Sequence, residues 1–282
     1  MSATTAYPRT TSPDAIPGSG TPYALLAQVR SEVVRYRRMP EYFIGVVVLP
    51  IILYAMFGLP NAGSSLPEGT TVTAILFVSF ACYGVVSQAL FSFGAELATE
   101  RQKGWLRRLR ATPMPMWLYF TGKLALNVVF ILAIIGGLIA LAATAGQANF
   151  EVDALLRTVG VLVLGTVAFS PMGAAIAYWV RPKAATTIVN LVFLPLAFMS
   201  GFFFSLSSLP QVLQDIAPFL PTYHFGQLAW GAMAPSEADR LAFGLPQATD
   251  PALSAAVVAG WFVLCSVIAA AGYRRELERE RD

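Results

Sequence analysis

Residues Val72 to Phe93 read VTAILFVSFACYGVVSQALFSF and contain no Asp, Glu, Lys or Arg. An α-helix of roughly 20 apolar residues is needed to cross a bilayer core of about 30 Å, so this stretch is typical of a transmembrane span. The whole chain has the same character, with 56% hydrophobic and 12% charged residues and a mean hydropathy of +0.62. Soluble domains carry about 25% charged residues. The composition therefore predicts an integral membrane protein.

Five other charge-poor runs of similar length occur along the chain. Three of the runs contain a proline, Pro50, Pro171 or Pro195, which lipid-buried helices tolerate better than soluble helices do. The sequence predicts an all-α integral membrane protein with six transmembrane helices, at approximately Tyr42–Leu59, Val72–Phe93, Leu124–Thr144, Thr158–Val180, Ala185–Leu206 and Leu253–Tyr273.

The basic residues are distributed unevenly between the segments that connect these spans. All of the 19 Lys and Arg residues except Arg157 and Arg240 fall on one side of the predicted membrane, including those of the short Arg181-Pro182-Lys183 turn. Basic residues near span ends favour the cytoplasm, so both termini are predicted to be cytoplasmic. We expect a disordered tail at residues 1–22, one membrane domain at residues 23–273 and a charged tail at residues 274–282.

Two segments on the basic side have an amphipathic pattern. Tyr23 to Arg38 is expected to lie as a helix in the inner interface, or to be an ordinary solvated helix, and carries Arg30, Arg35, Arg37 and Arg38. In the loop from Glu96 to Lys123, the apolar residues Trp105, Leu106 and Leu109 fall on one side of a short helix. The remaining face is expected to meet water, acidic lipid or a protein partner, or only to set orientation, through Arg101, Arg107, Arg108 and Arg110.

The segment from Ser207 to Pro251, on the opposite side, is long for a connection. Its short apolar bursts are broken by Pro210, Pro218 and Pro221, and none reaches spanning length. Bursts of this size predict re-entrant or interfacial helices between the fifth and sixth spans. Nearby aromatic residues either anchor the outer rim or contribute to function: Phe202, Phe203, Phe204 and Trp230.

Several kinds of chemistry are not indicated. The phosphate-binding pattern G-x-x-x-x-G-K-[ST] is missing, since Leu124 follows Gly122-Lys123, so the chain is not expected to hydrolyse ATP. The predicted spans hold no charged residue away from their ends, which disfavours an ion-driven carrier. His224 is the only histidine, and Cys82 and Cys265 lie in apolar runs. We therefore predict no catalytic, cofactor-binding or metal-binding residues, and no nucleic-acid partner.

Two stretches resemble a known family. Glu100 to Pro113, ERQKGWLRRLRATP, is similar to a segment between the second and third spans of the permeases of the type-2 ATP-binding cassette (ABC) transporters, which include drug, antibiotic and polysaccharide exporters. Ser200 to Tyr223 is similar to the segment after their fifth span. The chain departs from many relatives by having Trp105 and the pair Arg107-Arg108 in the first stretch. In the second stretch it has Ser205 where a proline is often found.

The resemblance implies a half-transporter that pairs with a second permease copy, in a homodimer or heterodimer. Two ABC ATPase subunits would bind it and hold ATP and magnesium. It implies an ATPase-coupling helix formed by Glu100, Arg101, Gly104, Trp105, Leu106, Arg107, Arg108, Leu109 and Arg110. An outer re-entrant or gate region would comprise Gly201, Phe202, Phe203, Phe204, Pro210, Pro221 and Tyr223, and an interface helix would carry Arg30, Arg35, Arg37 and Arg38.

The function expected from this resemblance is ATP-driven export of an amphipathic or lipophilic substrate across a bacterial-type plasma membrane. A drug or antibiotic is the leading expectation, followed by a lipid or glycan. An ion-gradient-driven carrier or channel is the alternative, and an intramembrane enzyme or scaffold is a further one.

Overall fold

The computed structural model describes residues 44–112, 115–234 and 236–279, and these contain helices but no β-strand. The long helices are α3 (Leu49–Gly58), α4 (Val72–Leu90), α7 (Met116–Thr144), α8 (Val152–Trp179), α9 (Pro182–Met199) and α13 (Pro251–Arg279). Shorter helices are α5 (Leu97–Gln102), α6 (Trp105–Arg110), α10 (Gln211–Ile216), α11 (Pro221–Met233) and α12 (Glu237–Phe243). Two π-helical segments, η1 (Ile44–Val48) and η3 (Phe91–Glu96), and three 3-10 turns, η2 (Leu59–Asn61), η4 (Leu206–Ser208) and η5 (Ala217–Phe219), complete the order.

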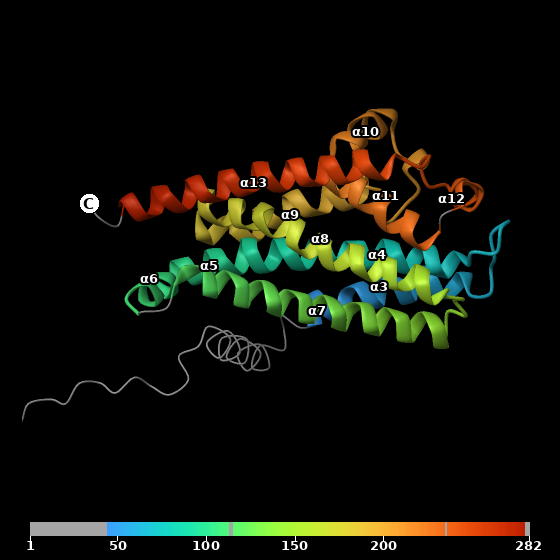
Figure 1. Ribbon diagram of the computed structural model, residues 1–282, viewed down its shortest axis with the longest axis horizontal. Helices are drawn as coiled ribbons and strands as arrows, with labels where there is room; N and C mark the ends of the chain where they lie inside the picture. The colour runs from blue at the N-terminus through green and yellow to red at the C-terminus, as the bar shows by residue number, and fades with distance from the viewer. Residues whose placement is uncertain (1–43, 113–114, 235, 280–282) are drawn as a thin grey trace, which may run out of the picture.

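The long helices run side by side along the molecule (Figure 1). Five helices of the described chain are long and apolar enough to cross a membrane: Val72–Gln102, Met116–Thr144, Val152–Trp179, Pro182–Met199 and Pro251–Arg279. The predicted multi-pass, all-helical architecture is thus confirmed. The predicted first span corresponds to a shorter apolar helix, Val46–Asn61, so the count of six spans stays a prediction. The predicted interface helix and N-terminal tail lie outside the described residues.

The helices of the structure differ in length from several of the predicted spans, whose bounds in the membrane stay predictions. α4 continues through η3 and α5 as one helix, Val72–Gln102, and α7 begins at Met116. Most of the predicted Glu96–Lys123 loop is therefore helical. α13 extends to Arg279, so residues 274–279 of the predicted charged tail continue this helix. α9 instead ends early, at Met199, because the chain turns at Gly201, whose φ of +82° suits glycine.

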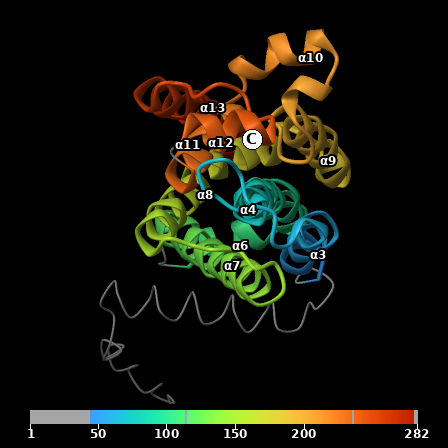
Figure 2. The ribbon, with the colours of Figure 1, turned by 90° about the vertical axis from the view of Figure 1, so that its right-hand side faces the viewer.

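α4 forms the core of the bundle. Every residue from Thr73 to Leu90 is buried, as expected of a helix that is hydrophobic on all sides. Seen from the end, α4 lies between α3, α7, α8 and α9 (Figure 2). α9 and α13 are peripheral, because only 22% and 17% of the residues in their 18-residue apolar stretches are buried. A displacement of α4 therefore affects more of the bundle than a displacement of either peripheral helix.

The two ends of the bundle carry different structures. α5, α6 and the C-terminal part of α13 lie at one end, here called the α6 end, and α10 and α12 lie at the other (Figure 1). α11 packs among α4, α8 and α13. Trp230 on α11 donates from Nε1 to Ser79 Oγ on α4 at 3.1 Å, and His224 lies 3.1 Å from Ser254 Oγ on α13. Short helices occur where the sequence predicts them, while their depth in the lipid stays a prediction.

Candidate functional site

The turn between α5 and α6 depends on Gly104. Its φ of +67° lies in the left-handed region, and its N–H donates to the Arg101 carbonyl at 3.0 Å. This conformation ends α5 and starts α6 in a new direction, at little steric cost for glycine. α6 is attached to the bundle by Leu106, which is 1% exposed and belongs to a buried apolar cluster with Leu97 and Tyr119. The short helix is therefore a fixed part of the α6 end.

The outward face of α6 carries Trp105, Arg107 and Arg108. Trp105 is 40% exposed, both arginines are exposed, and the Arg108 guanidinium lies 5.6 Å from the Trp105 ring centroid. Together these three side chains form a basic, partly aromatic surface, here called the α6 face. Such a surface suits a partner that presents acidic and apolar groups.

Arg101 and Arg110 do not face outward as predicted from the sequence. Arg101 donates from Nε to Glu276 at 2.7 Å, and its guanidinium lies 4.8 Å from the Tyr178 ring. Arg110 lies 5.5 Å from the Tyr273 ring. The prediction failed because α13 extends far enough to bring Tyr273 and Glu276 beside this segment.

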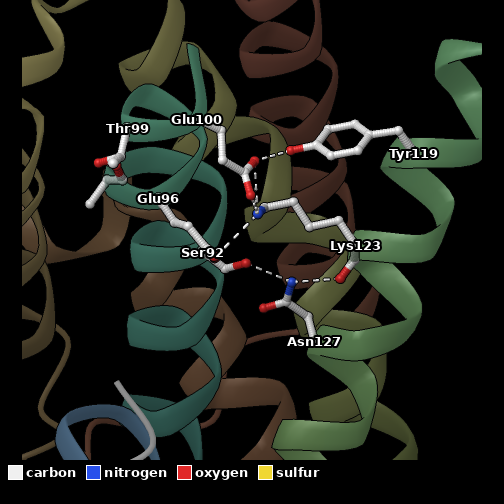
Figure 3. A network of polar contacts seen from close by, with 8 residues as sticks. Ser92, Glu96, Thr99, Glu100, Tyr119, Lys123 and Asn127 are labelled. Atoms are coloured by element: carbon white, nitrogen blue, oxygen red, sulfur yellow. Dashed lines mark hydrogen bonds and ion pairs between the residues drawn. The ribbon is translucent and has the colours of Figure 1, made fainter. Parts of the chain in front are cut away.

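A buried ionic cluster lies between α7 and the helix that contains η3 and α5 (Figure 3), and its Tyr119 shares an apolar cluster with Leu106 of α6. Lys123, on α7, has a fully buried side chain, and its Nζ lies 3.2 Å from Glu96 Oε2 and 3.3 Å from Glu100 Oε2. Tyr119, one turn before Lys123, donates its hydroxyl hydrogen to Glu100. Burying a charge is costly unless it is paired and hydrogen-bonded. The cluster meets this requirement with two carboxylates, one ammonium group and a hydroxyl donor.

Asn127 extends this cluster by one more turn of α7. Its Nδ2 donates to Ser92 Oγ at 2.9 Å and to the Lys123 carbonyl at 2.8 Å (Figure 3). Ser92 and Glu96 belong to the π-helical segment η3. A π turn holds an extra residue and changes the angular position of the residues after it. The ionic cluster thus joins α7 to the helix that contains α4, η3 and α5.

The predicted spans leave these charged residues outside, yet the helices of the structure include them. Lys123 lies inside α7, and Glu96 and Glu100 lie inside the continuous Val72–Gln102 helix. Glu100 is 4% exposed, so its carboxylate faces the ionic cluster and not a docking partner. A span predicted from hydropathy ends at the first charged residue. In the structure the helices continue past these residues, because their charges neutralise one another between two packed helices.

The second candidate region lies at the opposite end of the bundle. Phe202 is buried, with its ring centroid 5.9 Å from that of Trp230. The ring centroids of Phe203 and Tyr83 are 5.2 Å apart. Phe204 is 49% exposed. Pro221 and Tyr223 are buried at the start of α11, and Pro210 precedes α10. The structure brings the predicted aromatic residues together with α4 and α11.

A family model described as ABC-2 type transporter matches residues 23–233. The chain belongs to the ABC-2 type transporter family. It is also 26% identical over 216 residues to a Bacillus subtilis (strain 168) protein named "Putative transport permease YvfS", with 73% of this chain and 84% of that protein aligned. The permease is therefore a multi-pass transport component, and belongs to a class whose members normally work with an ATPase subunit.

The family match covers α6, the ionic cluster and the aromatic region, but stops at the end of α11. Sequence reasoning did not identify Glu96, Tyr119 or Lys123 as members of a buried cluster. A signal was available, since residues 119, 123 and 127 are spaced four apart and so share one helical face. Glu96 and Glu100 have the same spacing. These two polar faces predict a contact between the segments only if both segments are assumed to be helical. The four predicted interface arginines lie outside the described residues.

Proposed function

We propose that this permease is the membrane-spanning subunit of an ATP-driven exporter and that a separate ATPase subunit binds the α6 face. The observation that carries the proposal is the attachment of α6. Its outward face is exposed at Trp105, Arg107 and Arg108, while its inward face is held by Leu106 beside the ionic cluster. A helix held in this way transmits an applied movement, whereas a flexible loop absorbs it.

The proposed path of that movement follows the continuous helix. A push on α6 reaches α5 through the Gly104 turn and then η3 and α4, which form one helix from Val72 to Gln102. The ionic cluster couples the same helix to α7 through Lys123. Because α4 packs against α3, α7, α8 and α11, its displacement rearranges the bundle. ATP-driven closure of the partner subunits would use this route to open an outward path.

In the proposed assembly two permease copies associate, as a homodimer or a heterodimer, with two ATPase subunits that hold ATP and magnesium. The assembly belongs in a bacterial-type plasma membrane with both termini cytoplasmic. Its cargo is amphipathic or lipophilic: a drug or antibiotic, or a lipid or glycan. The family membership supports transport, and the apolar walls of the bundle support a cargo of this chemistry.

A second candidate function is an ion-gradient-driven carrier, and the buried ionic cluster is the observation that favours it. Ionisable side chains inside span-length helices are common in proton relays and ion paths, and Lys123, Glu96 and Glu100 are such groups. This alternative predicts transport by the purified chain under a proton or sodium gradient without any ATPase. The exporter proposal predicts no transport under those conditions.

The test of the exporter proposal compares two sets of exposed residues at the α6 end. One variant replaces Trp105, Arg107 and Arg108 by alanine, and the control replaces the exposed Lys183 and Arg274 by alanine. Both are co-expressed with ABC ATPase subunits of the source organism. We expect the first variant to lose ATPase co-purification and ATP-dependent transport at unchanged membrane level, with the control unaffected. Full activity of both variants would contradict docking at the α6 face.

A further inference from the structure

An apolar cleft lies on the side of the bundle between α7, α8 and α13. Its volume is about 400 Å³, and its walls include Phe93, Phe120, Leu124, Pro171, Ala174 and Phe262. This volume falls within the range of about 300 to 1,000 Å³ that is typical of ligand sites. The cleft is open to the outside of the bundle beside Val167, Thr121 and Ala270, which are exposed.

A second, basic hollow adjoins the cleft at the α6 end. Its volume is about 220 Å³, and its lining includes four arginines and one glutamate: Arg101, Arg181, Arg275, Arg279 and Glu276. Glu276 forms an ion pair with Arg101 at 2.7 Å. The other three arginines therefore give the hollow a net positive charge. The hollow therefore favours an anion, and arginine is well suited to bind phosphate.

Tyr178 lines both cavities and connects them. Its hydroxyl oxygen is buried and finds no hydrogen-bond partner within the part of the chain that the structure describes. Buried hydroxyl groups nearly always have a partner. An acceptor supplied by a bound molecule at the junction of the two cavities would satisfy this group.

We propose that the two cavities form one amphipathic site for an anionic phospholipid from the leaflet at the α6 end. An acyl chain fills the apolar cleft, the phosphate group lies in the basic hollow, and the Tyr178 hydroxyl donates to a headgroup or ester oxygen. The site contacts α8 and α13 and includes Arg101 of α5. A lipid bound there would brace the segment that carries α6. This inference depends on membrane insertion and not on the proposed ATPase partner.

The test measures lipid bound to the purified full-length chain by native mass spectrometry. The probes are phosphatidylglycerol and phosphatidylcholine with identical acyl chains. The wild type is expected to retain phosphatidylglycerol in preference. Tyr178→Phe should weaken its binding about fivefold, the loss of one net hydrogen bond. Equal retention of the two lipids by the wild type would overturn the anionic headgroup assignment.

Two neighbouring alanines provide a matched pair of cleft variants. Ala270 lines the cleft, whereas Ala271 is exposed and outside its lining. Ala270→Phe should displace phosphatidylglycerol, and Ala271→Phe should leave its binding unchanged, with both variants monodisperse by size-exclusion chromatography. Unchanged lipid binding by Ala270→Phe would refute the cleft as the acyl site. If that variant instead forms a smaller assembly and still binds the lipid, the cleft is a contact between copies of the chain and the proposal is wrong.

Discussion

At the residue scale, Lys123 shows how a charge is accommodated inside a span-length helix. Its side chain is fully buried, and the Glu96 and Glu100 side chains are 10% and 5% exposed. Solvent screening at this site is therefore weak, and the three groups depend on each other. Removal of one partner of such a buried ion pair costs about 3 to 5 kcal/mol.

Lys123→Met is accordingly expected to destabilise the permease by about that amount, because both carboxylates lose their ammonium partner. The measurement is the thermal unfolding midpoint of detergent-purified protein. Lys183→Met, at an exposed lysine, is the control and should have little effect. The double variant Lys123→Met with Glu100→Gln should recover part of the loss. Equal midpoints for Lys123→Met and the wild type would contradict a structural ion pair.

Asp239, at the opposite end of the bundle, is a second buried ionisable residue that joins two segments of the chain. It lies in α12, outside the span-length helices, and accepts hydrogen bonds from the backbone N–H groups of Glu68 at 2.8 Å and Thr70 at 3.1 Å. Burial acts to raise the pKa of its carboxyl group, but hydrogen bonds from Thr70 and Glu68 outweigh burial and hold this pKa below its usual value. The carboxylate thus ties the chain before α4 to α12.

The sign of this shift predicts a pH dependence. Because the folded-state pKa is lowered, the stabilisation is complete above the unfolded-state value of about 3.9 and is lost as the pH falls through the lower folded-state pKa. Asp239→Asn should therefore be less stable than the wild type at neutral pH, and the two proteins should begin to converge as the pH falls below about 4. The measurement is the difference in their unfolding midpoints across pH. A constant difference would contradict an ionised Asp239.

At the scale of the element, the close approach of α8 to the continuous helix depends on Gly173. A Cβ atom built there would lie 2.8 Å from the Ala89 carbonyl oxygen and 3.0 Å from the Gly94 nitrogen. Both are backbone atoms, so neither can move aside without displacing its helix. Small residues permit such contacts between helices in membranes. α8 and η3 therefore meet backbone to backbone, near the ionic cluster.

Gly173→Ala should destabilise the bundle because the added methyl group overlaps that backbone, at a cost of about 1 to 3 kcal/mol, as for overpacking in general. Gly160→Ala, in the same helix, is the matched control, because its Cβ would meet nothing within 4 Å. That change should be neutral or stabilise by about 0.5 to 1 kcal/mol. Heat-induced unfolding of the two variants compares them directly. Equal unfolding midpoints for the two variants would contradict a close approach at Gly173.

At the scale of the whole molecule, the charge distribution of the sequence matches the two ends of the bundle. Arg101, Arg181, Arg275 and Arg279 line one hollow at the α6 end, although they come from distant parts of the chain. The loop before α4 and the segment from α10 to α12 lie at the other end (Figure 1). The predicted orientation places the α6 end in the cytoplasm.

Cysteine labelling on intact cells tests this orientation. Ser64, in the loop before α4, and Gln102, the last residue of α5, are both exposed, and these two segments lie at opposite ends of the bundle (Figure 1). The natural Cys82 and Cys265 are both buried. We expect an impermeant thiol reagent to label Ser64→Cys without permeabilisation and Gln102→Cys only after it. The reverse pattern would show that the α6 end faces outward. The parent chain, with its two natural cysteines, measures the background.

The sequence by itself determined the helical membrane class, the centres of the five long spans and the family resemblance. Long runs without charge exclude a soluble fold, and each run can be recognised without reference to the others. Tertiary structure decided how far the helices extend and where Glu100, Lys123, Arg101 and Arg110 point. The physical reason is that a charged side chain is tolerated in a buried position only when it is paired, and here another helix supplies the partner. That partner lies far away in the sequence, and packing alone brings it near.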